Sequence, residues 1–440
     1  MKKLVCGLLA SMLLSGTAAA LEPISQPIAT SGYTYYAIRA DGALLAWGDS
    51  FHGAVGPTDQ DPLPWEEANV LLEDARYVDA GFVMAAAIDE EGTLWGWGGT
   101  HNGRAFGEEE PYRLLEDVVS VSVMDSMCAA LRTDGAVWTW GPRSGKSLAE
   151  HQDDPFYPPT QVSDHVVNLC ADLAVLEDGT LVQLLMDGET AAIRPLMEHV
   201  ADVRIEYGDD TLLVQALDGS LWRVPCTAAE EEASGLQVYV LEQPEKLLEE
   251  VSHFSPGLAV TADGTLWAWG HQRPAMLRDG RVDPEDPYGW KHYDDVVKIT
   301  DGVISAVACS DRTLAVLEDG SLWQLPSARE VIELADRGEI WSGTLTEPEK
   351  LLDQVRMPSP APAFAADAPA PAVVESASLE AWEAQREETE AEPEAQVPQP
   401  VPEPPAEAER PEQSSAAGLV TAALSAAVLA LLGWLRGKRQ

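Results

Sequence analysis

The chain has 440 residues, enough for one large domain or two ordinary ones with appendages. It is strongly acidic, with 73 Asp and Glu against 28 Lys and Arg and a formal net charge of -45. Because nucleic-acid binding requires a basic surface, this charge excludes DNA and RNA as expected partners. It is typical of a highly soluble surface or secreted protein.

The N-terminus has the pattern of a secretion signal. Two lysines precede an apolar run over residues 4–14, and three alanines ending at Ala20 match a small-residue cleavage site. An uncleaved anchor is the weaker interpretation, because the apolar run is too short to span a bilayer. Residues 1–20 are therefore predicted to be a signal peptide.

A hairpin pattern then recurs along residues 21–357. Its clearest copy, residues 133–141, reads Thr-Asp-Gly-Ala-Val-Trp-Thr-Trp-Gly and follows an apolar run. Asp-Gly between two strand-like runs predicts a β-hairpin with a two-residue type I′ turn, because Gly adopts positive φ without steric cost. Seven glycines occupy this place, at steps of 50, 43, 44, 40, 45 and 56: Gly42, Gly92, Gly135, Gly179, Gly219, Gly264 and Gly320. The chain therefore contains seven repeats.

A second marker keeps the same spacing. Segments built around Leu-Leu and an acidic residue stand at 70–74, 113–118, 246–251 and 350–355, where each leads into the next repeat or ends the last one. A period in the forties with several strands per unit is typical of a β-propeller, whose ring removes exposed end sheets. The predicted fold is all-β: a seven-bladed β-propeller over residues 21–357. Residues near 345–357 are expected to pair with the segment near 23–33 and close the ring.

The repeats also resemble a known family. An aliphatic strand, Asp-Gly, aromatic-x-Trp-Gly and a Gly-rich loop, best kept at 48–56 and 97–107, resemble the regulator of chromosome condensation repeat over about residues 23–357. The resemblance implies seven four-stranded blades. It implies little about activity, since the family includes nucleotide-exchange factors, ubiquitin-ligase modules and a secreted β-lactamase inhibitor. The family's Gly-x-x-His is missing, repeats four, five and seven lack the Trp-Gly loop, and a signal peptide opposes a nuclear exchange activity.

The composition changes after the repeats. Residues 358–413 are rich in Ala, Pro and Glu, and are predicted to be a disordered acidic linker or stalk. Residues 414–435 carry no charge and are predicted to be a transmembrane helix, followed by a basic cytoplasmic tail at 436–440. The end resembles that of bacterial cell-wall proteins but lacks a Leu-Pro-x-Thr-Gly sorting signal. We expect a single-pass type I membrane protein with an extracellular body.

The sequence contains no catalytic motif with a defined mechanism. We therefore expect a protein that is not an enzyme, with no catalytic, cofactor-binding or metal-binding residues. The Asp-Gly aspartates are interpreted as turn formers, because Asp bonds its own backbone. His52 and His101 occupy similar loop positions, but neither has a second ligand at metal spacing, and both are interpreted as loop residues.

Four cysteines follow the predicted signal peptide: Cys128, Cys170, Cys226 and Cys309. In an oxidising compartment they could form two disulfides with three possible pairings. They also lie in or near apolar strands, where a free thiol behaves as a small hydrophobe. Buried thiols are the favoured interpretation.

The candidate binding residues are aromatic side chains in long insertions between repeats: Trp65, Tyr288, Trp290, His292 and Tyr293. Exposed aromatic rings on a rigid scaffold are typical binding anchors, and packing over a blade edge is the alternative. The predicted function is a monomeric, non-enzymatic cell-surface scaffold that binds a protein or cell-wall component. An extracytoplasmic inhibitor of an enzyme such as a hydrolase is the alternative. A third hypothesis, an enzyme in the central channel, requires a buried cluster of carboxylates or His there.

Overall fold

A computed structural model of the chain describes residues 20–31, 34–81, 84–99, 108–124, 127–142, 156–186, 191–206, 210–230, 237–270, 295–308, 312–326, 348–361 and 363–375. The chain divides into two units, Met1–Glu388 and Thr389–Gln440, and all described residues belong to the first. Within these described residues, two short 3-10 helices, η1 (Phe51–Gly53) and η2 (Trp65–Glu67), interrupt a structure that otherwise consists of strands and turns.

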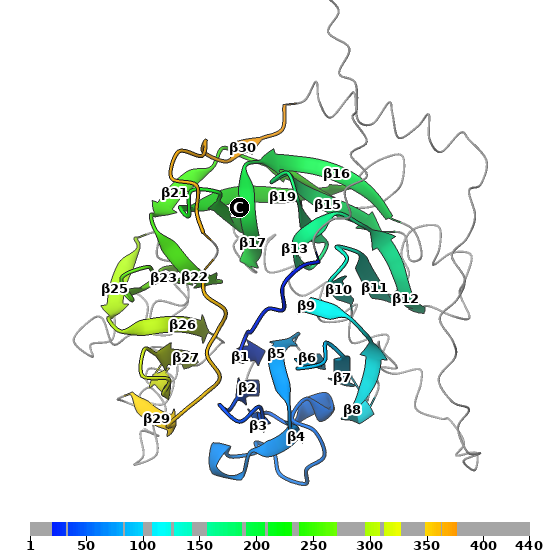
Figure 1. The fold of residues 1–440 in the computed structure, drawn as a ribbon, viewed down its shortest axis with the longest axis vertical. Coiled ribbons are helices and arrows are strands. Elements are labelled where there is room, and N and C mark those ends of the chain that lie inside the picture. Colours follow the sequence, from blue (N-terminus) through cyan, green and yellow to red (C-terminus); the bar gives the residue numbers. More distant parts are fainter. Residues whose placement is uncertain are drawn as a thin grey trace, which may run out of the picture. The chain divides into compact units, whose positions relative to one another are not determined.

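The described strands form seven antiparallel sheets arranged as a ring (Figure 1). Blade one contains β1 (Ile28–Ser31), β2 (Thr34–Ile38), β3 (Leu44–Gly48) and β4 (Asn69–Leu72). Blade two contains β5 (Ala75–Ala80), β6 (Met84–Asp89), β7 (Leu94–Gly98) and β8 (Glu108–Leu115). Blade three contains β9 (Val118–Val123), β10 (Cys128–Arg132), β11 (Val137–Pro142) and β12 (Phe156–Ser163). Blade four contains β13 (Val166–Cys170), β14 (Leu173–Leu176), β15 (Leu181–Met186), β16 (Ala191–Glu198) and, from far along the chain, β30 (Ala372–Val373).

The last three blades follow the same plan. Blade five contains β17 (Val200–Glu206), β18 (Thr211–Ala216), β19 (Leu221–Glu230) and β21 (Glu245–Leu248), with β20 (Gln237–Leu241) paired to the far end of β19. Blade six contains β22 (Val251–Ser255), β23 (Leu258–Thr261), β24 (Leu266–Ala268) and β25 (Val297–Thr300). Blade seven contains β26 (Val303–Ala308), β27 (Arg312–Leu317), β28 (Leu322–Pro326) and β29 (Glu349–Leu352). The predicted all-β, seven-bladed propeller is confirmed. Its first strands lie nearest the centre (Figure 1).

Apolar packing between the blades holds the ring together. Seven buried clusters of described residues each combine side chains from two adjacent blades, and together they cover all seven interfaces. Between blades one and two, for example, Tyr36 and Ile38 pack with Val78 and Trp97. Each blade therefore buries its two faces against its neighbours, as the repeated small, branched and aromatic residues require.

The repeated turn differs from the predicted type. In the first copy, the N–H of Gly42 donates to Arg39 O and the N–H of Arg39 donates to Ala43 O, both at 2.9 Å, so the loop has three residues. Gly42 has φ of 93°, whereas Asp41 keeps a negative φ. This is a type I turn followed by a left-handed glycine, and the predicted type I′ turn is wrong. The Asp41 carboxylate favours this geometry because it accepts the N–H of Ala43 at 3.2 Å.

The turn glycines also join each blade to the next. In all seven copies, the glycine carbonyl accepts a backbone N–H from the residue that begins the next inner edge, at 2.8 to 3.1 Å. The glycine and donor pairs are Gly42 and Ala75, Gly92 and Val118, Gly135 and Val166, Gly179 and Val200, Gly219 and Val251, Gly264 and Val303, and Gly320 and Val355. Each bond gives the carbonyl of a turn glycine the partner that a buried carbonyl requires. The same turn geometry is therefore found in every blade.

Both ends of the propeller form the inner edge of blade one. Ile38 donates its N–H to Pro27 O, and its carbonyl accepts the N–H of Arg356, both at 2.8 Å. Val355 also forms an antiparallel bridge with Arg39. The two segments expected to close the ring therefore meet at blade one, but they divide one strand edge between them instead of pairing along their length.

The structure differs from the predicted linker over residues 358–375. This segment, named the strap here, continues from blade seven and is hydrogen bonded to the amino-terminal residues, to blade five and to blade four (Figure 1). The predictions for 376–413, 414–435, 436–440 and most of the signal peptide concern residues outside the described ranges. Among the residues that are described, no helix is long and apolar enough to span a membrane.

Candidate interaction surface

The connectivity gives the propeller two different faces. Strands alternate in direction, so the seven Asp-Gly or Glu-Gly turns and the connectors between blades lie on one face, named the turn face here. The links between third and fourth strands lie on the opposite face, named the loop face. The insertion after β3, which contains η1 and η2, belongs to the loop face.

The amino-terminal segment, residues 20–27, lies on the turn face. Its Leu21 N–H donates to Thr133 O in the turn of blade three at 2.8 Å. Gln26 then pairs with blade two, donating its N–H to Arg76 O and accepting the N–H of Val78, both at 3.1 Å. The segment therefore runs from blade three across blade two to the start of β1, as Figure 1 also shows.

Arg76 fixes the amino-terminal segment to the ring. Its side chain is buried, with 3% exposure. Nη1 donates to Ile24 O at 2.5 Å, and Nη2 donates to Val118 O in blade three at 2.6 Å. Burial lowers the pKa of Arg76, while the nearby carboxylate of Glu90 opposes that shift. One guanidinium therefore satisfies main-chain carbonyls from two separate segments.

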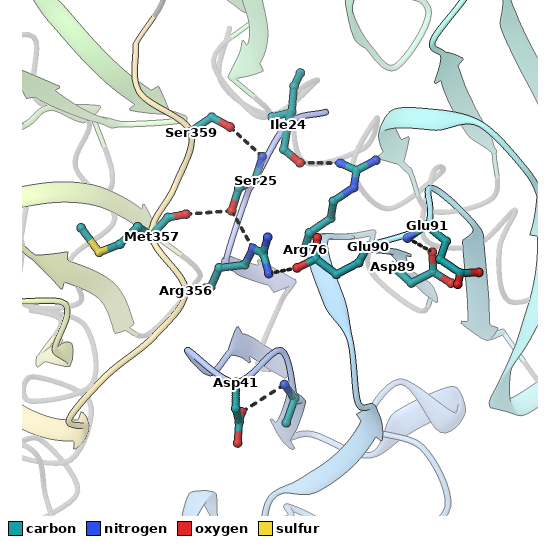
Figure 2. A network of polar contacts seen from close by, with 11 residues as sticks. Ile24, Ser25, Asp41, Arg76, Asp89, Glu90, Glu91, Arg356, Met357 and Ser359 are labelled. Atoms are coloured by element: carbon teal, nitrogen blue, oxygen red, sulfur yellow. Dashed lines mark hydrogen bonds and ion pairs between the residues drawn. The ribbon is translucent and has the colours of Figure 1, made fainter. Parts of the chain in front are cut away.

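Arg356 lies beside Arg76 and contacts the same segment from the other end of the chain (Figure 2). Its Nε donates to Ser25 Oγ at 3.3 Å, and its Nη1 forms an ion pair with Glu90 in blade two. The Ser25 hydroxyl in turn donates to Met357 O at 2.8 Å. Arg76 follows Ala75 and Arg356 follows Val355, so each arginine is the second residue of an inner strand edge. The closure of the ring at blade one by residues 355–359, named the seam here, therefore repeats a feature of blade two.

The strap next crosses the turn of blade five. The Phe364 ring lies directly over Gly219, since a Cβ atom placed on that glycine would be 2.6 Å from Phe364 Cδ2. The N–H of Ala365 donates to Leu217 O at 2.9 Å. The glycine that the turn requires for its φ of 84° thus also provides the flat surface on which the ring rests.

The strap ends as an added strand on blade four. β30 is antiparallel to β16, with Val373 opposite Met197 and Ala372 opposite Glu198. The N–H of Val374 donates to Leu196 O at 2.9 Å. Val373 packs against the cluster between blades four and five, and Pro371 is buried. The outer edge of blade four is therefore covered by the chain itself.

The predicted binding residues lie on the loop-face side of the fold or outside the described ranges. Trp65 belongs to η2 and is half-buried, packed against the cluster that contains Trp47 between blades seven and one. Tyr288, Trp290, His292 and Tyr293 fall within 271–294, which lies outside the described residues. Trp65 therefore packs over a blade edge, as the alternative to a binding role expects. Binding by the five residues stays a prediction.

Several ionisable residues on the inner strands were not singled out from the sequence. Asp79 in β5 accepts the N–H of Val123 in the next blade at 2.8 Å. Arg204 in β17 is paired with Asp202 and lies 5.4 Å from the Phe254 ring centroid in blade six. His253 in β22 lies 3.2 Å from Ala306 O in blade seven. The bonds of Asp79 and His253 and the contact of Arg204 with Phe254 cross the interfaces between blades near the central channel.

Burial governs the ionisation of these groups. It raises the pKa of Asp79 to about 6, although two backbone N–H bonds oppose the shift. It lowers the pKa of His253 to about 4, with the positive charge of Arg204 acting in the same direction. Inner-strand carboxylates and a histidine are therefore present, as a channel enzyme would require. Because they bond the neighbouring backbone, their arrangement favours a role in holding adjacent blades together.

The remaining sequence-based candidates have structural positions where they are described. Cys128 and Cys226 are buried free thiols and Cys170 is a half-buried one. Cys309 lies outside the described residues, so the interpretation of the four cysteines as buried thiols stays a prediction. His52 is nearly buried within η1, and His101 lies outside the described residues. Over the described ranges no group of three or more His, Cys, Asp or Glu side chains could hold a metal ion.

Seven sheets, each with four or five described strands, form a ring and define the class of the protein as a seven-bladed β-propeller. No protein-family model and no curated protein sequence matches the chain. Solved propeller structures are similar to it: yeast RCC1 (Prp20) bound to Kap60 has a TM-score of 0.47 and 16% identity, covering 89% of this chain and 100% of that one. Prp20p from Saccharomyces cerevisiae, solved in work on its binding to Gsp1p and histones, has a TM-score of 0.45 and 16% identity, covering 84% and 97%. Human WBSCR16 has a TM-score of 0.46 and 16% identity, covering 66% and 84%.

Proposed function

We propose that the chain is a non-enzymatic, protein-binding propeller that is displayed outside the cell and recognises its partner through the loop face. The observation that carries the proposal is the occupation of the turn face by two segments of the chain itself, residues 20–27 and the strap. The amino-terminal segment and the strap both bond the turns and connectors there. A partner would compete with these contacts on the turn face, whereas the loop face carries the described insertion between β3 and β4.

The strap also supports a direction of display. It keeps the chain on the turn-face side as far as Val374, whose N–H bonds blade four. The acidic Pro-rich linker and the uncharged segment at 414–435 follow it in the sequence. A tether that begins in this way would leave the loop face open to a soluble or surface-bound protein. The signal peptide and the membrane helix remain parts of this proposal.

A comparison of loop-face and turn-face variants in the full chain tests the binding proposal. The loop-face variant replaces Tyr288, Trp290 and Tyr293 by Ala, and the turn-face control replaces the exposed Asp178 by Asn. Affinity capture from the extracellular fraction, followed by titration of the recovered protein, is expected to show at least tenfold weaker binding for the loop-face variant alone. Equal affinity of the loop-face variant and the wild-type chain would contradict it.

The location is tested separately by protease treatment of intact cells. The body of the full chain is expected to be cleaved from outside and to remain with the membrane fraction. Deletion of residues 414–440 is expected to release the body into the medium. A body that is protected until the cells are lysed would sink the proposed location and leave the binding experiment unaffected.

A further inference from the structure

We infer that the turn of blade five and the outer edge of β16 form a docking track for an extended peptide, which the strap occupies in cis. The inference goes beyond the proposed loop-face function, because it adds a second site and names its class of partner: a peptide with an aromatic residue, a proline seven positions later and a valine two positions beyond the proline. The track lies on the turn face. It is therefore distinct from the loop-face site proposed above.

The edge of β16 recognises main chain. An outer strand presents unpaired N–H and C=O groups, and extended peptides bind such edges by adding a strand. The strap shows this mode on blade four, where β30 aligns with Met197 and Glu198 and Val374 bonds Leu196 O at 2.9 Å. These main-chain hydrogen bonds can hold an extended peptide on β16 whatever the side chains of the peptide are.

Side-chain contacts give the track its selectivity. Phe364 lies on Gly219, where any side chain on the turn would occupy the position of the ring. Pro371 is buried, and Val373 packs against the apolar cluster of blades four and five. An aromatic residue, a proline seven positions later and a valine two positions beyond it therefore define the ligand that this surface fits. The prolines limit the conformational freedom that binding removes.

The track can empty without opening the ring. The seam is held by Val355, Arg356 and Ser359, which bond Gly320, Ile38 and Ser25. Pro360 and Ala363, between the seam and Phe364, are exposed. The part of the strap on blades five and four is thus attached through its own contacts, and a second peptide of the same chemistry can replace it there.

The test uses the intact chain and a fluorescent peptide with the sequence of residues 360–375. The variant Phe364→Ser with Val373→Asp weakens the strap and leaves the track unchanged. A matched control, Ala366→Ser with Glu375→Gln, alters exposed strap positions. Fluorescence anisotropy is expected to show at least tenfold tighter peptide binding to the weakened variant than to the wild type or the control. Equal binding by all three would overturn the inference.

Two glycine substitutions then locate the bound peptide. In the weakened background, Gly219→Ala is expected to reduce peptide binding at least tenfold, because its Cβ occupies the aromatic site. Gly92→Ala imposes the same kind of backbone strain at the equivalent turn of blade two, where the nearest atoms belong to Asp117 and Val118 at 3.7 Å. It is expected to leave binding unchanged. Equal losses would contradict the track.

If the double variant fails to fold, judged by circular dichroism, Phe364→Ser alone provides the test, since it leaves β30 in place. A gain in peptide binding of severalfold is expected, and no gain would overturn the inference. These outcomes do not depend on residues 288–293. Failure of the peptide experiment would therefore not affect the loop-face proposal. Failure of the loop-face experiment would not affect the inferred docking track.

Discussion

Ser25 and Ser359 are joined by two hydrogen bonds although 334 positions separate them in the sequence. The N–H of Ser25 donates to Ser359 Oγ at 2.8 Å (Figure 2), and the N–H of Ser359 donates to Ser25 O at 2.9 Å. The pair lies beside the inner edge of blade one, which both ends of the propeller complete. Ring closure is thus a property of residues on both sides of the predicted domain boundary.

Replacing Arg356 tests the seam. Arg356→Ala removes the ion pair with Glu90 and the bond to Ser25 Oγ, and Arg356 is partly buried, with 26% side-chain exposure. The free energy of unfolding is expected to fall by about 1–2 kcal/mol, because bonds to charged groups exceed neutral ones. Urea denaturation followed by tryptophan fluorescence measures the change.

The matched control for the seam is Arg113→Ala. Arg113 pairs with Glu116 within one connector, and both side chains are more than half exposed. Exposed pairs of this kind contribute little, about 0–1 kcal/mol. A loss for Arg356→Ala no greater than that for Arg113→Ala would show that the seam does not depend on this side chain.

Arg76→Met is expected to have a larger effect. The substitution keeps the apolar stem but leaves Ile24 O and Val118 O without their buried donor. The expected loss is about 2–4 kcal/mol, since each buried acceptor without a partner is costly. Limited proteolysis is expected to cleave the amino-terminal segment faster in the variant. Unchanged cleavage would mean that other contacts hold the segment.

The pH dependence of the folding stability is expected to follow from two inner-strand groups whose pKa values are shifted in opposite directions. Asp79 keeps its proton in the folded state up to about pH 6, above its ordinary value of 3.8, so stability falls as pH rises through this window. His253 titrates at about 4 when folded, below its ordinary 6.5, so stability rises with pH between those values. The two contributions oppose each other over about pH 4–6.

Asp79→Asn separates these contributions. The amide oxygen can still accept the N–H of Val123, but the residue no longer ionises. The variant and the wild type are expected to unfold at similar urea concentrations at pH 4, and the variant is expected to be more stable at pH 7 by up to about 3 kcal/mol. A difference that does not change between pH 4 and pH 7 would refute the assigned ionisation of Asp79.

The propeller could be predicted because its signals are local and repeated. Each turn glycine and the apolar strand before it mark one blade, and seven copies define the ring. The strap could not be predicted in this way. Its Ala-Pro composition is typical of a disordered linker, whereas its attachment depends on backbone groups of Leu217 and Leu196, more than a hundred positions away. The role of Arg76 was missed for the same physical reason, since its acceptors are main-chain carbonyls with no sequence signature.

A substitution at the turns tests how these glycines position the ring. Gly42 has φ of 93°, and an added Cβ would lie 3.0 Å from Glu73 O in the adjoining connector. Gly302 also has positive φ, 75°, but an added Cβ would meet nothing within 4 Å. Both alanine variants carry backbone strain of about 1–3 kcal/mol. Because Gly42→Ala adds a clash with main chain, it is expected to lower the midpoint of thermal unfolding further than Gly302→Ala. Equal midpoints would show that the connector containing Glu73 moves away from the added Cβ at little cost. The hydrogen bond from Ala75 N–H to Gly42 O would then not fix the spacing of blades one and two.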